Sequence, residues 1–372
     1  MLRNQLEATQ PDLVPTLHRR ASQWYEGSGL IPEAVDHTLA AQDFDRAARL
    51  IEQIGFSLLT RSEFATVSRW LEAMPEDFVR SQPWLCIFKA WMVRRAGRLD
   101  AVEQLVQDAE RALESESAPI ASDADLQAIR ANIATLHAYM AIFNGEISRA
   151  IELSHQALEL FPPDHLIRGV TSVTLGLAYR MKGDLAGAVK AFAEARSTSQ
   201  KMGNIFLTHI ATWHMGYTLM LQGQLHQAID AYRESLELAS EQGKRRILYA
   251  GQPHIYIGSI LREWNELEAA EAQLREGIEL CEPTRLLDAL TDGYLAMARV
   301  RLAQGDLKGA VDACGDAQQM LQVPNPEPVS LIRADDCRVQ LWLAQGKYQE
   351  AARWAEESGL RVDYELSYVS EF

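Results

Sequence analysis

The chain has 372 residues, with 36 lysines and arginines against 51 aspartates and glutamates, so its formal net charge is −15. Such an acidic chain would repel a phosphate backbone, which argues against nucleic-acid binding by this segment. A hydrophobic content of 47% excludes a disordered protein. No apolar run approaches the roughly 20 residues that span a bilayer, and the N-terminus lacks a signal-peptide core. We therefore expect a cytoplasmic location.

Residues 1–78 are predicted to form an N-terminal helical arm, a degenerate start of a longer helical array. Apolar periodicity predicts helices over residues 13–25, 31–41 and 44–54. Gln42, followed by Phe44 and Ala47, imitates the turn that recurs further along the chain.

From residue 79 onward the sequence repeats a turn residue, an apolar residue two positions later and usually an alanine five positions later. A second small residue follows twelve positions after the turn. The turn residues are Gly97, Gly145, Gly183, Gly223, Asn265, Gly305 and Gly346. The alanines that follow them are Ala150, Ala188, Ala228, Ala270, Ala310 and Ala351.

This spacing is typical of paired antiparallel helices, because small residues let two helices approach closely. One hairpin cannot bury its apolar face alone, so hairpins stack on their neighbours. The pattern is that of the tetratricopeptide repeat, with longer helices and connections. We expect an all-α fold, a right-handed superhelical solenoid of about seven to eight hairpins, with residues 79–372 as its main region.

The histidines and cysteines do not indicate a metal site. Cys86, Cys281, Cys314 and Cys337 are scattered without the short spacings of zinc ligands, so buried free thiols are expected. His209 and His214 are five residues apart, which does not place them on one helix face. We expect no metal ligands here.

No catalytic signature is present: P-loop, GxGxxG, HExxH and GxSxG patterns are all missing from the sequence. We therefore expect this segment not to be an enzyme and to need no cofactor of its own.

The first helix of each hairpin is expected to line a groove. Aromatic and arginine side chains there can stack on a ring and pair with anionic groups. The alternative is that these aromatics only pack between hairpins. Asp292 and Arg333 also fall at groove positions. The candidate ligand contacts are Trp91, Asn132, Tyr139, Arg180, Trp213, Tyr217, Gln252, Arg262 and Arg299.

Four stretches carry a family resemblance. REWNELEAAEAQLREGIEL (Arg262 to Leu280) closely resembles a signature of MalT-like, LuxR-family bacterial transcription regulators. Leu17 to Glu52 and Arg69 to Trp91 resemble the same family, as does the C-terminal end with ELSYVSEF.

The resemblance implies a signal-transduction ATPase with numerous domains. Such a regulator would have a nucleotide-binding module using ATP and Mg²⁺, a helical arm, a tetratricopeptide-like sensor and a DNA-binding helix-turn-helix. This chain would be the sensor, excised from a longer protein and ending where the family pattern continues. Its partners would be a small-molecule or protein inducer and the regulator's own other domains, and self-association is a further expectation. The alternative is a scaffold that binds a peptide or regulatory protein.

Overall fold

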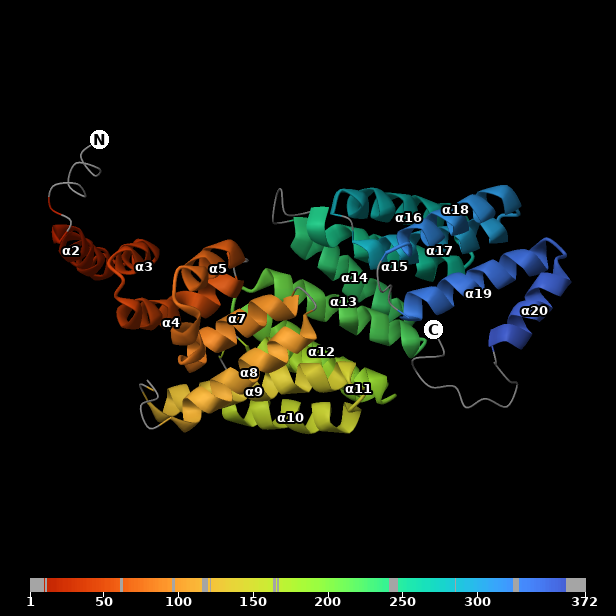
Figure 1. Ribbon diagram of the computed structural model, residues 1–372. Coiled ribbons are helices and arrows are strands. Elements are labelled where there is room, and N and C mark those ends of the chain that lie inside the picture. The colour runs from red at the N-terminus through yellow and green to blue at the C-terminus, as the bar shows by residue number, and fades with distance from the viewer. Residues whose placement is uncertain are drawn as a thin grey trace. The chain divides into compact units, whose positions relative to one another are not determined.

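The computed structural model describes residues 10, 12–60, 63–95, 98–115, 120, 122–162, 165, 167–240, 247–284, 286–323 and 328–358 (Figure 1). Within these ranges the chain is helical and has no strand, which confirms the predicted all-α class. The chain divides into two compact units. Unit 1 comprises Met1–Ala178 and Thr198–Phe206, and unit 2 comprises Tyr179–Ser197 and Leu207–Phe372. The predicted boundary at residue 78 stays a prediction.

Among the described residues, five helices open unit 1, and the three predicted in this region are confirmed, the third extending further than expected. They are α2 (Leu13–Gly27), α3 (Ile31–Ala40), α4 (Phe44–Thr60), α5 (Phe64–Glu72) and α6 (Glu76–Arg80).

Seven helical hairpins follow in the described part of the chain, in agreement with the predicted repeat. The first helices of the hairpins are α7 (Pro83–Arg95), α9 (Asp123–Phe143), α11 (Arg168–Met181), α13 (Ile205–Leu221), α15 (Ile247–Glu263), α17 (Leu287–Ala303) and α19 (Pro328–Ala344). The second helices are α8 (Leu99–Glu114), α10 (Ile147–Leu160), α12 (Leu185–Lys201), α14 (Leu225–Ser240), α16 (Leu267–Cys281), α18 (Leu307–Met320) and α20 (Tyr348–Ser358). A short 3₁₀ helix, η2 (Glu282–Thr284), follows α16.

The turn residue of each hairpin has the same backbone conformation. Gly145, Gly183, Gly223, Gly305 and Gly346 all have positive φ, and Asn265 takes the same region at φ 59°. This conformation favours glycine and tolerates asparagine, so the predicted alignment is confirmed at these turns. Gly97 lies outside the described residues.

The same turn occurs twice before the hairpin array. Gln42 has φ 56°, and the alanine five residues later, Ala47, is fully buried. Gly29 has φ 75° and is followed by the fully buried Ala34, a match that sequence reasoning missed. The arm therefore uses the turn geometry of the repeats.

Small residues set the distance between paired helices. A Cβ placed on Gly277 of α16 would come within 2.8 Å of the Gly251 carbonyl oxygen on α15. Successive first helices also contact one another, as α7 with α9, α15 with α17 and α17 with α19. The first helices therefore share one continuous face within each unit.

Two further expectations concern burial and membranes. All four cysteines are buried free thiols, as predicted. Among the described residues, no helix is long and apolar enough to cross a membrane.

Candidate functional site

The face of the first helices in unit 2 carries a group of polar and aromatic side chains, which we name the Tyr217–Arg333 cluster. Its members come from the end of α11 and from α13, α15, α17 and α19. They are Arg180, Trp213, Tyr217, Tyr256, Asp292 and Arg333.

One side chain links the two ends of this face. Arg333 on α19 donates a hydrogen bond through Nη2 to the hydroxyl of Tyr217 on α13, passing over α15 and α17. Packed helices lie about 8–10 Å apart, so three steps along a flat row would span roughly 24–30 Å. An arginine and a tyrosine together do not reach that far. The row of first helices in unit 2 is therefore curved, with the cluster on its inner side.

Asp292 holds the centre of the cluster. Its Oδ1 accepts a hydrogen bond from Arg333 Nη1 at 2.8 Å, and its Oδ2 accepts one from the Tyr256 hydroxyl at 2.7 Å. Burial alone would lower the pKa of Arg333. The charge of Asp292, together with Tyr217 and Tyr256, has a larger effect in the opposite direction, so the pKa of Arg333 is raised. Burial and the charge of Asp292 raise the pKa of Tyr256 well above its usual value. Both groups therefore keep their protons near neutral pH.

Aromatic rings form the floor around these polar groups. The ring centroid of Tyr217 lies 5.6 Å from that of Tyr256 and 6.4 Å from that of Trp213. Tyr256 also stacks on the fully buried Tyr232, with centroids 5.5 Å apart. Tyr217 and Trp213 are half-buried, so part of each ring stays open to solvent.

Arg180 is a cation without an acidic partner in the described part of the chain. Its guanidinium lies 5.1 Å from the Tyr217 ring centroid and 3.4 Å from His214 Nδ1. Burial and the charge of Arg180 lower the pKa of His214 well below its usual value, so this histidine is neutral and does not repel the arginine. Arg180 Nε and Trp213 Nε1 are both buried without a hydrogen-bond acceptor in the structure. Buried donors of this kind are rare in native proteins and call for an explanation.

The structure brings only some of the nine predicted contacts together. Arg180, Trp213 and Tyr217 come together in the cluster. In unit 1, Trp91 Nε1 donates to Asn132 Oδ1 at 3.0 Å, and both side chains are buried. Tyr139 is half-buried, and the Arg94 guanidinium lies 4.6 Å from its ring centroid. The other three predicted contacts lie outside the cluster: Gln252 is half-buried on α15, Arg262 pairs with Glu263, and Arg299 pairs with Asp336 at 2.8 Å.

Sequence reasoning missed Tyr256, and it did not single out Asp292 and Arg333 from the other groove positions. A signal for the last two was present. Each stands 13 residues before the turn glycine of its hairpin, Gly305 and Gly346. Opposite charges at one register position of adjacent hairpins predict an ion pair, because neighbouring first helices run side by side.

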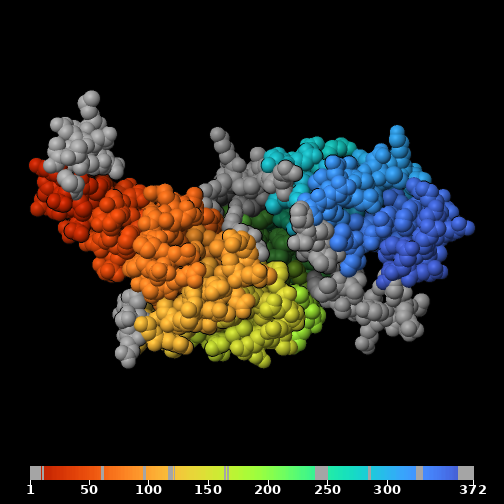
Figure 2. Space-filling model, viewed as in Figure 1, coloured from red at the N-terminus to blue at the C-terminus, as the bar shows by residue number. Residues whose placement is uncertain are grey.

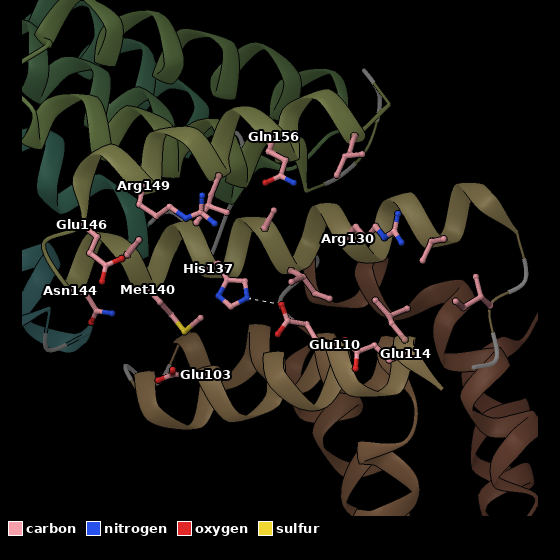
Figure 3. A pocket seen from close by; sticks show the side chains of 18 residues that line it. Glu103, Glu110, Glu114, Arg130, His137, Met140, Asn144, Glu146, Arg149 and Gln156 are labelled. Carbon is pink, nitrogen blue, oxygen red and sulfur yellow. Dashed lines mark hydrogen bonds and ion pairs between the residues drawn. The ribbon is translucent and has the colours of Figure 1, made fainter. Parts of the chain in front are cut away.

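Unit 1 has a groove on the side of the second helices (Figure 3). Helices α8 and α10 form its walls and α9 its floor, and its volume is about 970 Å³. His137 of α9 contacts Glu110 of α8 at 2.9 Å. Unit 2 has a smaller groove, about 430 Å³, between α14 and α16 over α15.

Repeated hairpins with a continuous face of first helices define a tetratricopeptide-type repeat region. The sequence profile of the family described as the MalT-like TPR region matches residues 131–372. The chain belongs to this family, which confirms the resemblance found in its sequence.

Curated relatives include the HTH-type transcriptional regulator MalT of Yersinia pestis (strain Pestoides F), 28% identical over 361 residues. MalT of Serratia proteamaculans (strain 568) is 27% identical over 356 residues. Both alignments cover 93% of this chain and 38% of the relative. The chain thus spans well under half the length of these relatives.

Solved structures share the fold. A signal transduction ATPase with numerous domains with a tetratricopeptide repeat sensor, from Pyrococcus horikoshii, has a TM-score of 0.64 at 14% identity, covering 93% of this chain and 54% of that chain. NprR in complex with its cognate peptide NprX has a TM-score of 0.60 at 10% identity, covering 87% of this chain and 91% of that chain.

Proposed function

We propose that this region is the inducer sensor of an ATP-dependent transcriptional activator, and that the inducer binds at the Tyr217–Arg333 cluster. The observation that carries the proposal is the pair of buried donors, Arg180 Nε and Trp213 Nε1, which lack acceptors beside half-exposed aromatic rings. A buried polar group without a partner is unfavourable, and a bound ligand with acceptor atoms would relieve that cost.

The cluster favours a ligand that combines a ring or other flat face with an anionic or acceptor-rich group. Arg180 and Arg333 contribute two positive charges and Asp292 one negative charge, while His214 is neutral. One negative charge on the ligand would balance this local excess, although the whole chain is strongly acidic. Trp213 and Tyr217 offer faces on which a ring can stack.

The position of the cluster supports coupling between binding and shape. Its side chains come from five hairpins, so a ligand held there would contact several of them at once. Such a ligand could shift an equilibrium between two shapes of the hairpin array, but only by its difference in affinity for the two shapes. We infer that the inducer favours one curvature of the first-helix row, and that other domains of the protein respond to this change.

The rest of the regulator is part of the same proposal. The relatives are HTH-type transcriptional regulators, so a helix-turn-helix outside this chain would bind DNA. A nucleotide-binding module that uses ATP and Mg²⁺ would drive oligomerisation in the cytoplasm. Reading the full gene tests this: a P-loop upstream and a helix-turn-helix downstream are expected, and the absence of both would overturn it.

Titration calorimetry against a metabolite set tests the site. Arg180→Gln and Tyr217→Ala should each weaken inducer binding by roughly tenfold or more, about 1.4 kcal/mol. Arg262→Gln is the matched control, since this arginine pairs with the adjacent Glu263 and lies outside the cluster. Equal affinity in all of these proteins would contradict the assignment of the site.

The second candidate function is a scaffold that binds a peptide or regulatory protein. The curved first-helix row supports it, because a polypeptide could follow several hairpins at once. A pull-down from the native host distinguishes the two. A stoichiometric polypeptide released by Tyr217→Ala would favour the scaffold, and binding of a metabolite alone would favour the sensor.

A further inference from the structure

Two of the four buried cysteines meet where the sixth hairpin contacts the seventh. Cys314 lies on α18 and Cys337 on α19, and these two helices pack against each other (blue in Figure 2). Both side chains are buried and both thiols are free. The thiol of Cys337 donates a hydrogen bond to the sulfur of Cys314. Two residues from different hairpins thus place their sulfur atoms in direct contact.

The other two cysteines have different surroundings. Cys86 of α7 donates through its thiol to the Val79 carbonyl oxygen at 3.3 Å. Cys281 ends α16 and faces Gly251 of α15. Burial raises the pKa of Cys86 to about 12 and that of Cys281 to about 11. Both therefore keep their protons at neutral pH and are poor nucleophiles.

The hydrogen bond makes the two thiols of the pair unequal. It lowers the pKa of Cys314 despite burial, and the charge of Arg338 acts in the same direction as the bond. The same hydrogen bond, together with burial, raises the pKa of Cys337. Cys314 is therefore the thiol that ionises, and Cys337 stays protonated beside it. A thiolate next to a second thiol is the arrangement in which disulfides form and break.

The cover over this contact is thin. Among the described side chains of α19, the buried ones are Ser330, Ala334, Cys337 and Leu341, whereas α17 buries nine residues. Gly315, which follows Cys314 on α18, is exposed, and no described atom lies within 4 Å of a Cβ placed on it. A helix with few buried contacts opens locally at a low cost in free energy. A molecule as small as hydrogen peroxide can therefore reach the sulfur of Cys314.

A metal site would be another use for paired cysteines. Structural zinc takes four ligands, most often cysteine and histidine. In the described ranges, no group of three or more His, Cys, Asp or Glu side chains could hold a metal ion. The pair therefore has the composition of a dithiol and not that of a zinc site.

We propose that Cys314 and Cys337 form a reversible disulfide, with Cys314 as the attacking thiol and Cys337 as the resolving thiol. The Cys314 thiolate attacks hydrogen peroxide, the O–O bond breaks, and the products after proton uptake are a sulfenic acid on Cys314 and water. The sulfur of Cys337 then attacks the sulfur of Cys314. Cys337 loses its proton, and the hydroxyl group leaves as a second water molecule.

The electrons of this reaction balance. Two thiols and one hydrogen peroxide give one disulfide and two water molecules, so the sulfur atoms lose two electrons and the peroxide gains them. A small-molecule dithiol reverses the reaction by thiol–disulfide exchange: it reduces the bond and takes up the disulfide itself.

The disulfide would join the seventh hairpin covalently to the sixth. Arg333 lies one helical turn before Cys337 on α19, and its guanidinium contacts Asp292 and Tyr217. A bond between α18 and α19 would therefore restrict one end of the Tyr217–Arg333 cluster. An effect on inducer binding rests on the proposed function. The disulfide itself forms without an inducer, so its test is independent of that function.

Peptide mapping of the folded, whole chain after treatment with hydrogen peroxide tests the bond. We expect a disulfide between Cys314 and Cys337, formed about tenfold or more faster than peroxide oxidises Cys86 or Cys281. Cys337→Ser should stop the reaction at a sulfenic acid on Cys314, which dimedone traps, and Cys314→Ser should leave Cys337 as a thiol. Cys86→Ser is the matched control and should form the bond at the wild-type rate. Circular dichroism confirms that each variant is folded.

Three results would overturn the proposal: a folded wild-type chain in which both thiols stay reduced, equal oxidation of all four cysteines, or a bond that dithiothreitol does not reverse. A Cys337→Ser chain without a sulfenic acid on Cys314 would contradict the assignment of the attacking thiol.

Amide hydrogen exchange tests the consequence for α19. Exchange in this helix should be several-fold slower in the oxidised chain than in the reduced chain, because the bond opposes local opening. The Cys314→Ser chain should show no such difference after the same peroxide treatment. Equal exchange in the reduced and oxidised wild-type chains would contradict the link between the bond and the cluster.

Discussion

Two grooves occupy the same place in the repeat, one over α9 and one over α15, yet they differ in size and in charge. The first measures about 970 Å³ and has four glutamates in its lining. The second measures about 430 Å³ and has no acidic residue in its lining. At the position 11 residues before the turn, α9 has Ala134 and α15 has His254, which contacts Gln273 of α16 at 2.8 Å. His254 therefore lies in the lining of the second groove and reaches across to α16.

The first-helix face also differs between the units, and here unit 2 has the polar groups that are available to a ligand. In unit 1, Trp91 and Asn132 bond to each other in the interior. In unit 2, Arg180 and Trp213 keep unpaired donors beside half-exposed rings. The turn and the small residues thus set one architecture, while the remaining positions decide which face of each unit is suited to binding. We expect unit 2 to bind the inducer on the face of its first helices.

We expect the largest effect from a substitution that disrupts the contact between α15 and α16 in unit 2. Gly277→Val would push side-chain atoms against the Gly251 carbonyl oxygen and Ile255, which an added Cβ already approaches within 2.8 Å and 2.7 Å. We expect a loss of roughly 3 kcal/mol in the free energy of unfolding, because overpacking moves backbone. Guanidinium denaturation measures it. Gly315→Ala on α18 is the control: nothing lies within 4 Å of its Cβ, so it should be neutral or slightly stabilising.

The next prediction compares two ion pairs of unit 2, the central Arg333–Asp292 pair and a more exposed one. Arg333→Met leaves Asp292 half-buried without its cation, and we expect a loss of about 2–3 kcal/mol in unfolding free energy. Adding Asp292→Asn should recover part of it. Arg299→Met breaks the more exposed pair with Asp336 and should cost less than about 1 kcal/mol. Equal losses at the two sites would show that the cluster is not specially buried.

In unit 1, Glu52 of α4 is a carboxyl group whose pKa is shifted by burial. Burial, helped by the charge of Asp125 and opposed by Arg49, raises its pKa from 4.5 to about 7. The folded chain therefore binds this proton more tightly than the unfolded chain, and the stability from this group is lost as pH rises through 7. Glu52→Gln should stabilise the protein by roughly 2 kcal/mol at pH 8 and have much less effect near pH 4.5. Thermal unfolding across this range measures the difference, and a pH-independent effect would contradict the raised pKa.

The smallest expected effect tests the closed face of unit 1. Trp91→Phe removes the donor to Asn132 and leaves a buried amide oxygen without that partner. We expect a loss of about 1 kcal/mol in unfolding free energy. Trp24→Phe, at an exposed position of α2, should change the free energy of unfolding by much less. Denaturation of both variants at low protein concentration makes the comparison.

The sequence alone was sufficient for the all-α class, the hairpin repeat and the family. These depend on local rules: a left-handed turn favours Gly145 or Asn265, and close helix packing requires Ala150 or Gly277. It also placed Arg180, Trp213 and Tyr217 on the first-helix face, since helical register fixes which side a residue takes. Residue type did not reveal that Trp91 and Asn132 bond to each other in the interior.

Only the tertiary structure decided which side chains meet. Arg333 and Tyr217 are 116 residues apart, and their contact depends on the curvature that several hairpins accumulate. Tyr256 joins the cluster because its hydroxyl reaches Asp292 on the next first helix. The groove over α9 likewise depends on how far α8 and α10 stand apart, a distance that packing sets and that no local pattern encodes.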